Sequence, residues 1–234
     1  MGQDVRSPRG PRCVALVGPF QSGKTTLLEA IMSRTGAIPK AGSVDAGTSH
    51  GDASPEARHH KMSVELSVAT TNFLGDSYTF IDCPGSVEFI HDMRAALPAV
   101  DAAVVVCEAD EKKVPQLQLI LRELEDLKIP RFLFLNKIDK ADKRVRETLK
   151  LLQPASRVPL VLRQIPIWNN DIVIGFVDLA LERADLLGKR RLLHAQLLRR
   201  ARDVALVSDG DEIAEVAQFH GDIQLIWKSL LSYI

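Results

Sequence analysis

The chain has 234 residues, 46% of them hydrophobic and 26% charged, which allows one large domain or a domain with an appendage. Thirty basic and thirty acidic residues cancel, so the overall charge does not point to a DNA partner. No uncharged apolar run approaches a membrane-spanning length, and the N-terminus lacks the apolar segment of a secretory signal. The three cysteines, Cys13, Cys83 and Cys107, have no metal-ligand spacing. We therefore expect a cytoplasmic protein with reduced, mostly buried thiols and no membrane partner.

The first part of the chain predicts a strand, a helix, a long loop and a hairpin. Residues 1–11 are rich in Pro, Gly and Arg, which is typical of a flexible lead-in. The apolar run Val14–Val17 predicts a buried strand, and an amphipathic helix should follow it to about Arg34. Residues 37–61 have no periodicity, and a loop this long is usually functional or mobile. Alternation in Met62–Ala69, then a turn and the strand Tyr78–Ile81, predict a hairpin.

Helices and strands then alternate along the chain. The expected elements are a helix at 88–97, a strand at 102–107, a helix at 116–127, a strand at 131–135 and a helix at 142–152. This alternation predicts an α/β fold with a doubly wound, mostly parallel sheet. Beyond it, Trp168 and the polar residues 169–171 are typical of a hairpin end, so we expect an appended hairpin-plus-helix subdomain.

Gly18-x-x-x-x-Gly23-Lys24-Thr25, between the first strand and helix, fits the phosphate-binding loop of P-loop NTPases. Glycines allow the backbone to curl closely around a phosphate, and the helix N-terminus attracts its negative charge. Lys24 would reach the β- and γ-phosphates, and the Thr25 hydroxyl would bind Mg²⁺. A chance match has odds of about 1%. The predicted nucleotide contacts are Gly18, Pro19, Phe20, Gln21, Ser22, Gly23, Lys24, Thr25 and Thr26.

Two more motifs follow predicted parallel strands. The Asp82 carboxylate can hold the Mg²⁺ shell through water, and the Gly85 N–H can reach a γ-phosphate. In Asn136-Lys137-Ile138-Asp139, one carboxylate can accept the adjacent N1–H and N2–H₂ of guanine, whereas adenine has an acceptor at N1. Ligands lie at the carboxyl ends of parallel strands, so these motifs predict one GTP site that includes Asp82, Gly85, Asn136, Lys137 and Asp139.

Over residues 12–185 the chain resembles a translational GTPase, and within that superfamily elongation factor G and elongation-factor-G-like proteins. The resemblance lies in GPFQSGKTTLLEAI, GDASPEARHHKMSVEL, FIDCPGSVEF, AAVVVCEAD, LFLNKIDKAD and VPLVLRQIPI…IVIGFVDL. It implies a GTP-binding domain over 12–153 and, over 154–234, part of a subdomain inserted in elongation factor G, with a divergent tail. It also implies a GTP/GDP switch that hydrolyses GTP with Mg²⁺ and acts on the ribosome in protein synthesis.

The resemblance assigns further roles. The segment between Thr35 and Ser63 would be switch I, in which Ser63 replaces the family's Mg²⁺-binding threonine, and Gly85–Leu97 would be switch II with its helix. The expected metal ligands are therefore Thr25, Ser63 and Asp82. The histidines of switch I, His50, His59 and His60, lack ligand spacing and are expected to be solvated.

Four features depart from the family pattern. Ser86 stands where the family has the histidine that orients the attacking water, so the expected catalytic residues are Lys24 and, with a shorter reach, Ser86. Gln21 replaces an aspartate, no Ser-Ala dipeptide occurs to back the base, and we expect none of the family's later domains within these 234 residues. Three alternatives stay open: a non-hydrolysing GTP-binding module, a truncated fragment, and an ATPase or kinase, against which Asn136–Asp139 argues.

The last fifty residues do not follow the family pattern. Residues 186–202 are leucine-rich and basic, which fits a helix with one apolar stripe and a solvated arginine face. The same arginines and lysines, over 189–202, could contact ribosomal RNA phosphates. Residues 208–222 are acidic and the chain ends on apolar residues, which would pack on the body, meet a partner or mark a truncated reading frame.

Overall fold

The computed structural model describes residues 12–44, 46–51, 57, 59, 62–73, 75–141, 145–169 and 172–178. The chain divides between Asn136 and Lys137 into two compact units, each of which is described by itself. The predicted lead-in at 1–11 and the basic segment 189–202 lie outside the described residues. Within the described residues, no helix is both long enough and apolar enough to cross a membrane.

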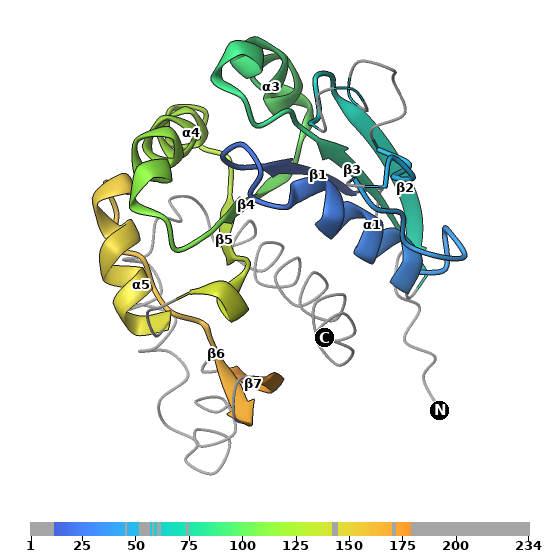
Figure 1. Cartoon of the computed structure of the whole chain (residues 1–234). Helices are drawn as coiled ribbons and strands as arrows, with labels where there is room; N and C mark the ends of the chain where they lie inside the picture. Colours follow the sequence, from blue (N-terminus) through green and yellow to red (C-terminus); the bar gives the residue numbers. More distant parts are fainter. Residues whose placement is uncertain are drawn as a thin grey trace, which may run out of the picture. The chain divides into compact units, whose positions relative to one another are not determined.

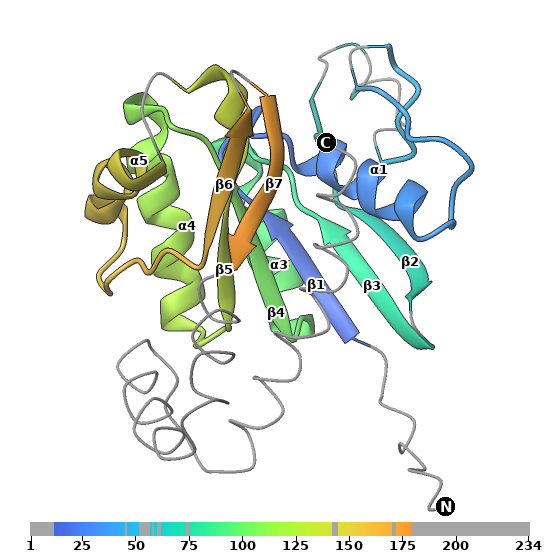
Figure 2. The same cartoon turned by 90° about the horizontal axis from the view of Figure 1, so that it is seen from below.

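The first unit is built on a mostly parallel sheet, as predicted (Figures 1 and 2). Within the described residues its order is β2-β3-β1-β4-β5, in which β2 pairs antiparallel with β3 and every other pairing is parallel. The strands are β1 (Arg12–Val17), β2 (Ser67–Phe73), β3 (Asp76–Asp82), β4 (Ala102–Cys107) and β5 (Arg131–Leu135). Because β3 and β4 flank β1 on opposite sides, the loop after β1 lies where the strand order reverses, which is where α/β sheets bind ligands.

Helices cover both faces of this sheet. Helix α1 (Lys24–Arg34) lies on one face, and α3 (Ile90–Ala96) and α4 (Val114–Asp126) lie on the other (Figure 1). A 3₁₀ turn, Val87–Phe89, precedes α3, so the regular helix begins two residues later than the predicted 88–97. Helix α4 begins with Pro115 in its first turn, where a missing N–H costs nothing. The doubly wound arrangement that the alternation predicts is confirmed.

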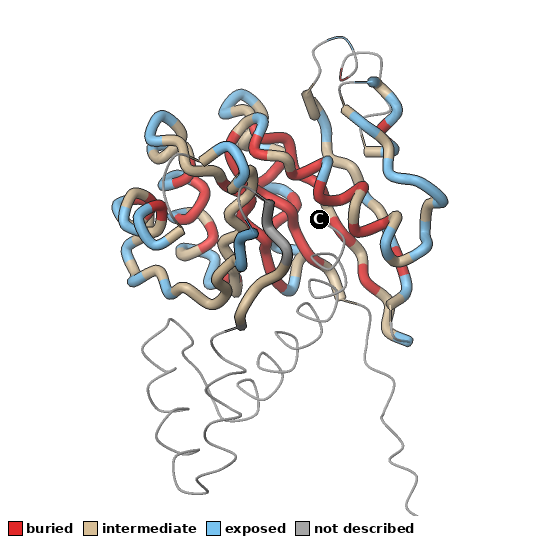
Figure 3. The backbone as a smooth tube through the Cα atoms, turned by 60° about the horizontal axis from the view of Figure 1, so that its bottom comes forward, coloured by how far each residue is buried: buried red, intermediate tan, exposed pale blue. Residues whose placement is uncertain are grey.

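The core lies between the central strands and these helices (Figure 3). Every residue of β4 is buried, as are Val14–Val17 of β1, because a central parallel strand is covered on both faces. On the sheet edge, β2 exposes alternate residues such as Val68. The apolar runs of β1 and β4 therefore mark the centre of the sheet, and the alternating pattern marks the edge strand β2.

One predicted strand is placed wrongly. The alternation in Met62–Ala69 predicts a strand there, but β2 runs over Ser67–Phe73. Its register with β3 pairs Ser67 with Asp82 and Phe73 with Asp76, so the length of β3 sets both ends of β2. The residues before Ser67 have no strand to pair with, and Ser63 instead contacts Thr25 of α1.

The second unit contains a short helix and a hairpin. Helix α5 spans Val145–Leu152, and the first three residues of the predicted helix at 142–152 lie outside the described residues. Strands β6 (Gln164–Asn169) and β7 (Ile172–Asp178) pair antiparallel, which confirms the predicted hairpin. Trp168 near its end is 42% exposed. The expected helix after the hairpin lies outside the described residues.

Candidate nucleotide-binding site

Two glycines of the phosphate-binding loop have torsions and close contacts that disfavour a side chain. Gly18 has a φ of 152°, and a Cβ there would lie 2.1 Å from the carbonyl oxygen of Val106 in β4. Gly23 has a φ of 96°, and its Cβ would lie 2.3 Å from Nδ2 of Asn136. Both torsions are ones that residues with a side chain rarely adopt. The loop therefore packs directly on the ends of β4 and β5, where a side chain would clash with it.

Asn136 also holds the loop itself. Its side-chain Nδ2 donates a hydrogen bond to the carbonyl of Ser22 at 2.8 Å. Its backbone N–H donates to the carbonyl of Cys107 at 2.7 Å, which fixes it at the end of β4. Sequence reasoning assigned Asn136 to the guanine base and missed this role. The order of the strands could have predicted this contact, because β5 lies next to β4 and its end is therefore close to the loop.

Lys24 and Gly85, both predicted phosphate contacts, lie together. Lys24 is 5% exposed, and its Nζ donates to the carbonyls of Gly18 and Pro19, each at 3.1 Å. A Cβ on Gly85 would lie 2.4 Å from that Nζ and 2.9 Å from the Pro19 oxygen. The chain at Gly85 thus approaches the phosphate-binding loop as closely as only a glycine allows.

The three expected metal ligands come together from three separate parts of the chain. Thr25 Oγ1 donates to Asp82 Oδ2 at 2.6 Å and lies 3.0 Å from Ser63 Oγ. Thr25 is 6% exposed and Asp82 is 1% exposed. Two hydroxyls and one carboxylate within hydrogen-bond distance form a set of hard oxygen donors, which suits Mg²⁺. The residues present therefore fit a magnesium ion.

Strand pairing places Asp82 in this cluster. Asp82 ends β3 directly opposite Leu16 of β1, and the next N–H, that of Cys83, donates to the Leu16 carbonyl at 3.0 Å. The carboxylate is thereby held at the same edge of the sheet as the loop that leads to Thr25. Burial, with a smaller effect of the Asp82 charge, raises the pKa of the Cys83 thiol to about 12. Cys83 is buried, which agrees with the expectation of mostly buried thiols.

A lysine at the start of α4 supports the loop from the side. Lys113 Nζ donates to the carbonyl of Phe20 at 2.9 Å and forms an ion pair with Glu108. No local pattern in the sequence distinguishes this lysine from a solvated one. Gln21, next to Phe20, adopts a φ of 54°, so the middle of the loop has left-handed backbone geometry without a glycine.

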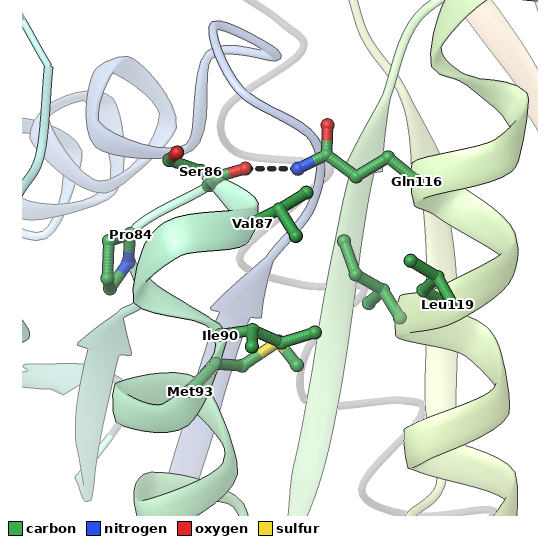
Figure 4. Close-up of a pocket in the computed structure, with 9 residues that line it drawn as sticks. Pro84, Ser86, Val87, Ile90, Met93, Gln116 and Leu119 are labelled. Atoms are coloured by element: carbon green, nitrogen blue, oxygen red, sulfur yellow. Dashed lines mark hydrogen bonds between the residues drawn. The ribbon is translucent and has the colours of Figure 1, made fainter.

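The segment that the resemblance identifies as switch II packs against α4 around a small apolar pocket (Figure 4). The Gln116 side chain reaches from α4 and donates to the Gly85 carbonyl. Below that bond, Val87, Ile90 and Met93 face Leu119 across the pocket. Ser86 lines the same pocket, is half-buried, and begins the Val87–Phe89 turn without capping it through its side chain.

The remaining predicted base contacts belong to the second unit. Lys137 has a φ of 53°, and Asp139 is exposed in the short 3₁₀ turn Ile138–Lys140. Their contact with guanine stays a prediction from the sequence. Thr26 is exposed on the first turn of α1, and whether it contacts nucleotide also stays a prediction.

This chain matches a known protein family over most of its length. Residues 10–218 match the family described as the elongation factor Tu GTP binding domain. An elongation factor G-like protein of Synechocystis is 41% identical over 173 residues, which cover 74% of this chain and 26% of that protein. An elongation factor G-like protein of Mycobacterium tuberculosis is 34% identical, covering 80% of this chain and 26% of that protein.

A solved structure is similar as well. The crystal structure of ttk003000868 from Thermus thermophilus matches with a TM-score of 0.63 at 32% identity, covering 71% of this chain and 25% of that one. The chain thus spans about a quarter of the length of these relatives. The family match extends over most of its residues. The chain therefore belongs to the elongation factor Tu GTP-binding domain family and is similar to the GTP-binding domains of elongation-factor-G-like proteins.

Proposed function

We propose that this chain binds GTP and GDP with Mg²⁺ and acts as a nucleotide-dependent switch of the elongation factor G type. The observation that carries the proposal is the cluster of Thr25, Ser63 and Asp82 at the start of the helix that follows the phosphate-binding loop. A turn that matched the loop motif by chance would have no reason to gather a threonine, a serine and a buried aspartate beside it. The proposal assigns residues 12–153 to the GTP-binding domain and 154–234 to part of an inserted subdomain.

Each residue has a defined part in this proposal. Bound Mg²⁺ would neutralise phosphate charge, held by the hydroxyls of Thr25 and Ser63 and, through water, by Asp82. Lys24 would exchange its bonds to the loop carbonyls for bonds to phosphate oxygens. The Gly85 N–H would donate to the γ-phosphate, so loss of that phosphate would release switch II. Asp139 would select guanine through two adjacent donors.

Nucleotide titration tests the binding step. Fluorescent mant-GDP and mant-GTP should bind the purified chain in the presence of Mg²⁺, with GTP displacing them far better than ATP. Asp139→Ala should weaken the affinity for GTP and narrow its advantage over ATP, because the two bonds to guanine are lost. Failure of the unaltered chain to bind either guanine nucleotide, or displacement by ATP as readily as by GTP, would overturn the proposal.

Hydrolysis is the second part of the proposal, with the ribosome in the cytoplasm as the partner. Lys24, the metal ligands and backbone donors would stabilise the charge that develops on the phosphates. Ser86 would orient the attacking water with a short hydroxyl, where the family uses a longer, titratable imidazole. Ser86 also motivates the second candidate, a non-hydrolysing GTP-binding module.

Phosphate release separates these two functions. A GTPase should show multiple turnovers that ribosomes stimulate, and Ser86→His should raise the stimulated rate because it restores the imidazole. A binding module should retain GTP affinity without stimulated turnover. The proposed contact between residues 189–202 and ribosomal RNA would appear as ribosome co-sedimentation that weakens with salt and with glutamine at the basic positions.

A further inference from the structure

Glu29 is a buried carboxylate to which neither the motifs nor the proposed chemistry gives a role. It lies on α1, four residues after Thr25, so both side chains lie on the same side of the helix. It is 2% exposed. A buried carboxylate is costly unless its charge is satisfied by hydrogen bonds, so its partners indicate what it does.

The partners of Glu29 all lie in the loop that the resemblance identifies as switch I. The backbone N–H of Gly42 donates to Oε2 at 2.7 Å, and the backbone N–H of His50 donates to Oε1 at 2.5 Å. The ring Nδ1 of His50 lies 3.1 Å from Oε2. Burial raises the pKa of Glu29, but the hydrogen bonds from Gly42 and His50 outweigh it, so the net pKa is lowered. The group is therefore an ionised anchor at neutral pH.

The residue after His50, Gly51, packs against the cluster of expected metal ligands. A Cβ on Gly51, the residue after His50, would lie 3.2 Å from the Thr25 methyl carbon and 3.9 Å from Asp82 Oδ2. The loop therefore runs from the anchor directly onto the cluster. His50 was expected to be a solvated loop histidine, and its side chain is indeed 57% exposed, but it also contacts the buried carboxylate.

We propose that Glu29 is a positioning residue that ties switch I to α1 and so controls how fast Mg²⁺ and its nucleotide are released. The anchor fixes the loop on the same helix that carries Thr25, which keeps Gly51 packed over the metal ligands. Without the anchor the loop would leave this surface more often, and water would reach the metal. The inference rests on the proposed function, because it concerns the release of the nucleotide proposed there.

Hydrogen exchange on the nucleotide-free chain tests the anchor directly. Glu29→Gln replaces one acceptor oxygen by an amide N–H₂ that faces a backbone N–H. We expect exchange at the Gly42 and His50 amides to become at least about tenfold faster, while amides in α1 and β4 keep their protection. The control is Glu147→Gln, the same change at an exposed position on α5, which should leave both loop amides unchanged.

Nucleotide release tests the role. We expect Glu29→Gln to release mant-GDP about tenfold faster at saturating Mg²⁺, the factor that fits loss of one buried charge-assisted hydrogen bond. In excess EDTA its rate should equal that of the unaltered chain, because the effect acts through the metal. His50→Ala removes the ring contact alone and should give a smaller acceleration, whereas Glu147→Gln, at an exposed position on α5, should give none.

The outcomes separate this inference from the proposed function. Equal release rates for Glu29→Gln and the unaltered chain in Mg²⁺, or equal acceleration with and without EDTA, would overturn the positioning role. Unchanged exchange at Gly42 and His50 would overturn the anchor. If the unaltered chain binds no mant-GDP, the proposed function fails, and the positioning role with it, while the exchange data still decide whether the anchor exists. If Glu29→Gln does not fold, Glu29→Asp, which withdraws the carboxylate from the two loop N–H groups by one methylene, decides by the same two measurements.

Discussion

The phosphate-binding loop and switch I approach the same cluster of oxygen atoms, but they are held in place by different means. The loop is fixed by the ends of the sheet, with Gly18 against the β4 carbonyl of Val106 and the Ser22 carbonyl bonded to the side chain of Asn136, which follows β5. Switch I is held through side chains, by Glu29 on one side and by the hydroxyl of Ser63 on the other. Contacts made by the sheet persist as long as the fold does, whereas side-chain contacts can be exchanged for those of a ligand. This difference indicates that the phosphate-binding loop stays in place as long as the fold does, whereas switch I can move away from it.

Adding a side chain to the phosphate-binding loop should have the largest effect on stability and on nucleotide binding. Gly18→Ala would place a methyl group 2.1 Å from a backbone oxygen in the buried strand β4. We expect the free energy of unfolding to fall by about 3 kcal/mol, from the combined overpacking and strained torsion, and nucleotide binding to be lost. Urea denaturation and mant-GDP titration would measure the two effects.

A matched glycine isolates the steric part of that effect. Gly75, in the turn between β2 and β3, has a φ of 90° and nothing within 4 Å of an added Cβ, so Gly75→Ala introduces only torsional strain. We expect it to lower the free energy of unfolding by about 1 kcal/mol and to leave nucleotide affinity unchanged. Equal losses for the two variants would contradict the packing of the loop on β4.

Removing the shared hydroxyl should have the next largest effect. Thr25→Val keeps the side-chain shape but takes away the donor to Asp82, leaving a buried carboxylate without that bond. We expect unfolding to require about 2 kcal/mol less in the nucleotide-free chain, and Mg²⁺ to lose its effect on nucleotide affinity. Thr70→Val, on the exposed side of β2, is the control and should change neither. Retained Mg²⁺ dependence in Thr25→Val would show that this cluster is not the metal site.

The contacts that hold switch I to α1 should weaken in acid, whereas those that hold the phosphate-binding loop should not. Because the folded pKa of Glu29 is lowered, its hydrogen bonds stabilise the fold above the ordinary glutamate pKa of about 4.3, and this contribution is lost as the pH falls through the lowered value. The gap in unfolding free energy between the unaltered chain and Glu29→Gln should be constant from about pH 7 to 5 and should narrow below about pH 4. Urea denaturation at pH 7, 5 and 3.5 measures this gap. Glu147→Gln should show no comparable gap, and a gap that stays constant at pH 3.5 would contradict the anchor.

The smallest expected effect is that of nucleotide on thiol labelling, because the labelled cysteines are buried in the rigid sheet. Burial raises the pKa of both Cys83 and Cys107 to about 12, so at pH 8 their thiolate fraction is about a thousandfold below that of a free cysteine. We expect neither to react with a thiol reagent in the folded chain, with or without nucleotide, and both to react in urea. Faster labelling of Cys83 alone in the nucleotide-free chain would show that the end of β3 opens and moves together with switch I.

Local patterns were sufficient for the central strands and the motifs that end them. β4 and β5 begin and end where the apolar runs predict, and the phosphate-binding loop could be recognised from its glycines and its lysine alone. The predicted start of β2 was wrong because strand pairing, which links residues far apart in the chain, sets the ends of an edge strand. The resemblance alone assigned Ser63 to the metal, since a serine in a long loop has no pattern of its own.

The sequence by itself determined the fold class, the phosphate-binding loop and the family to which the chain belongs. Each of these depends on residues that are close together along the chain, where spacing and residue type carry the information. Only the tertiary structure decided that Asn136 and Lys113 support the loop and that Glu29 holds switch I. Those contacts join segments that the sheet order brings together. A lone carboxylate, amide or ammonium shows no periodicity from which its partner could be inferred.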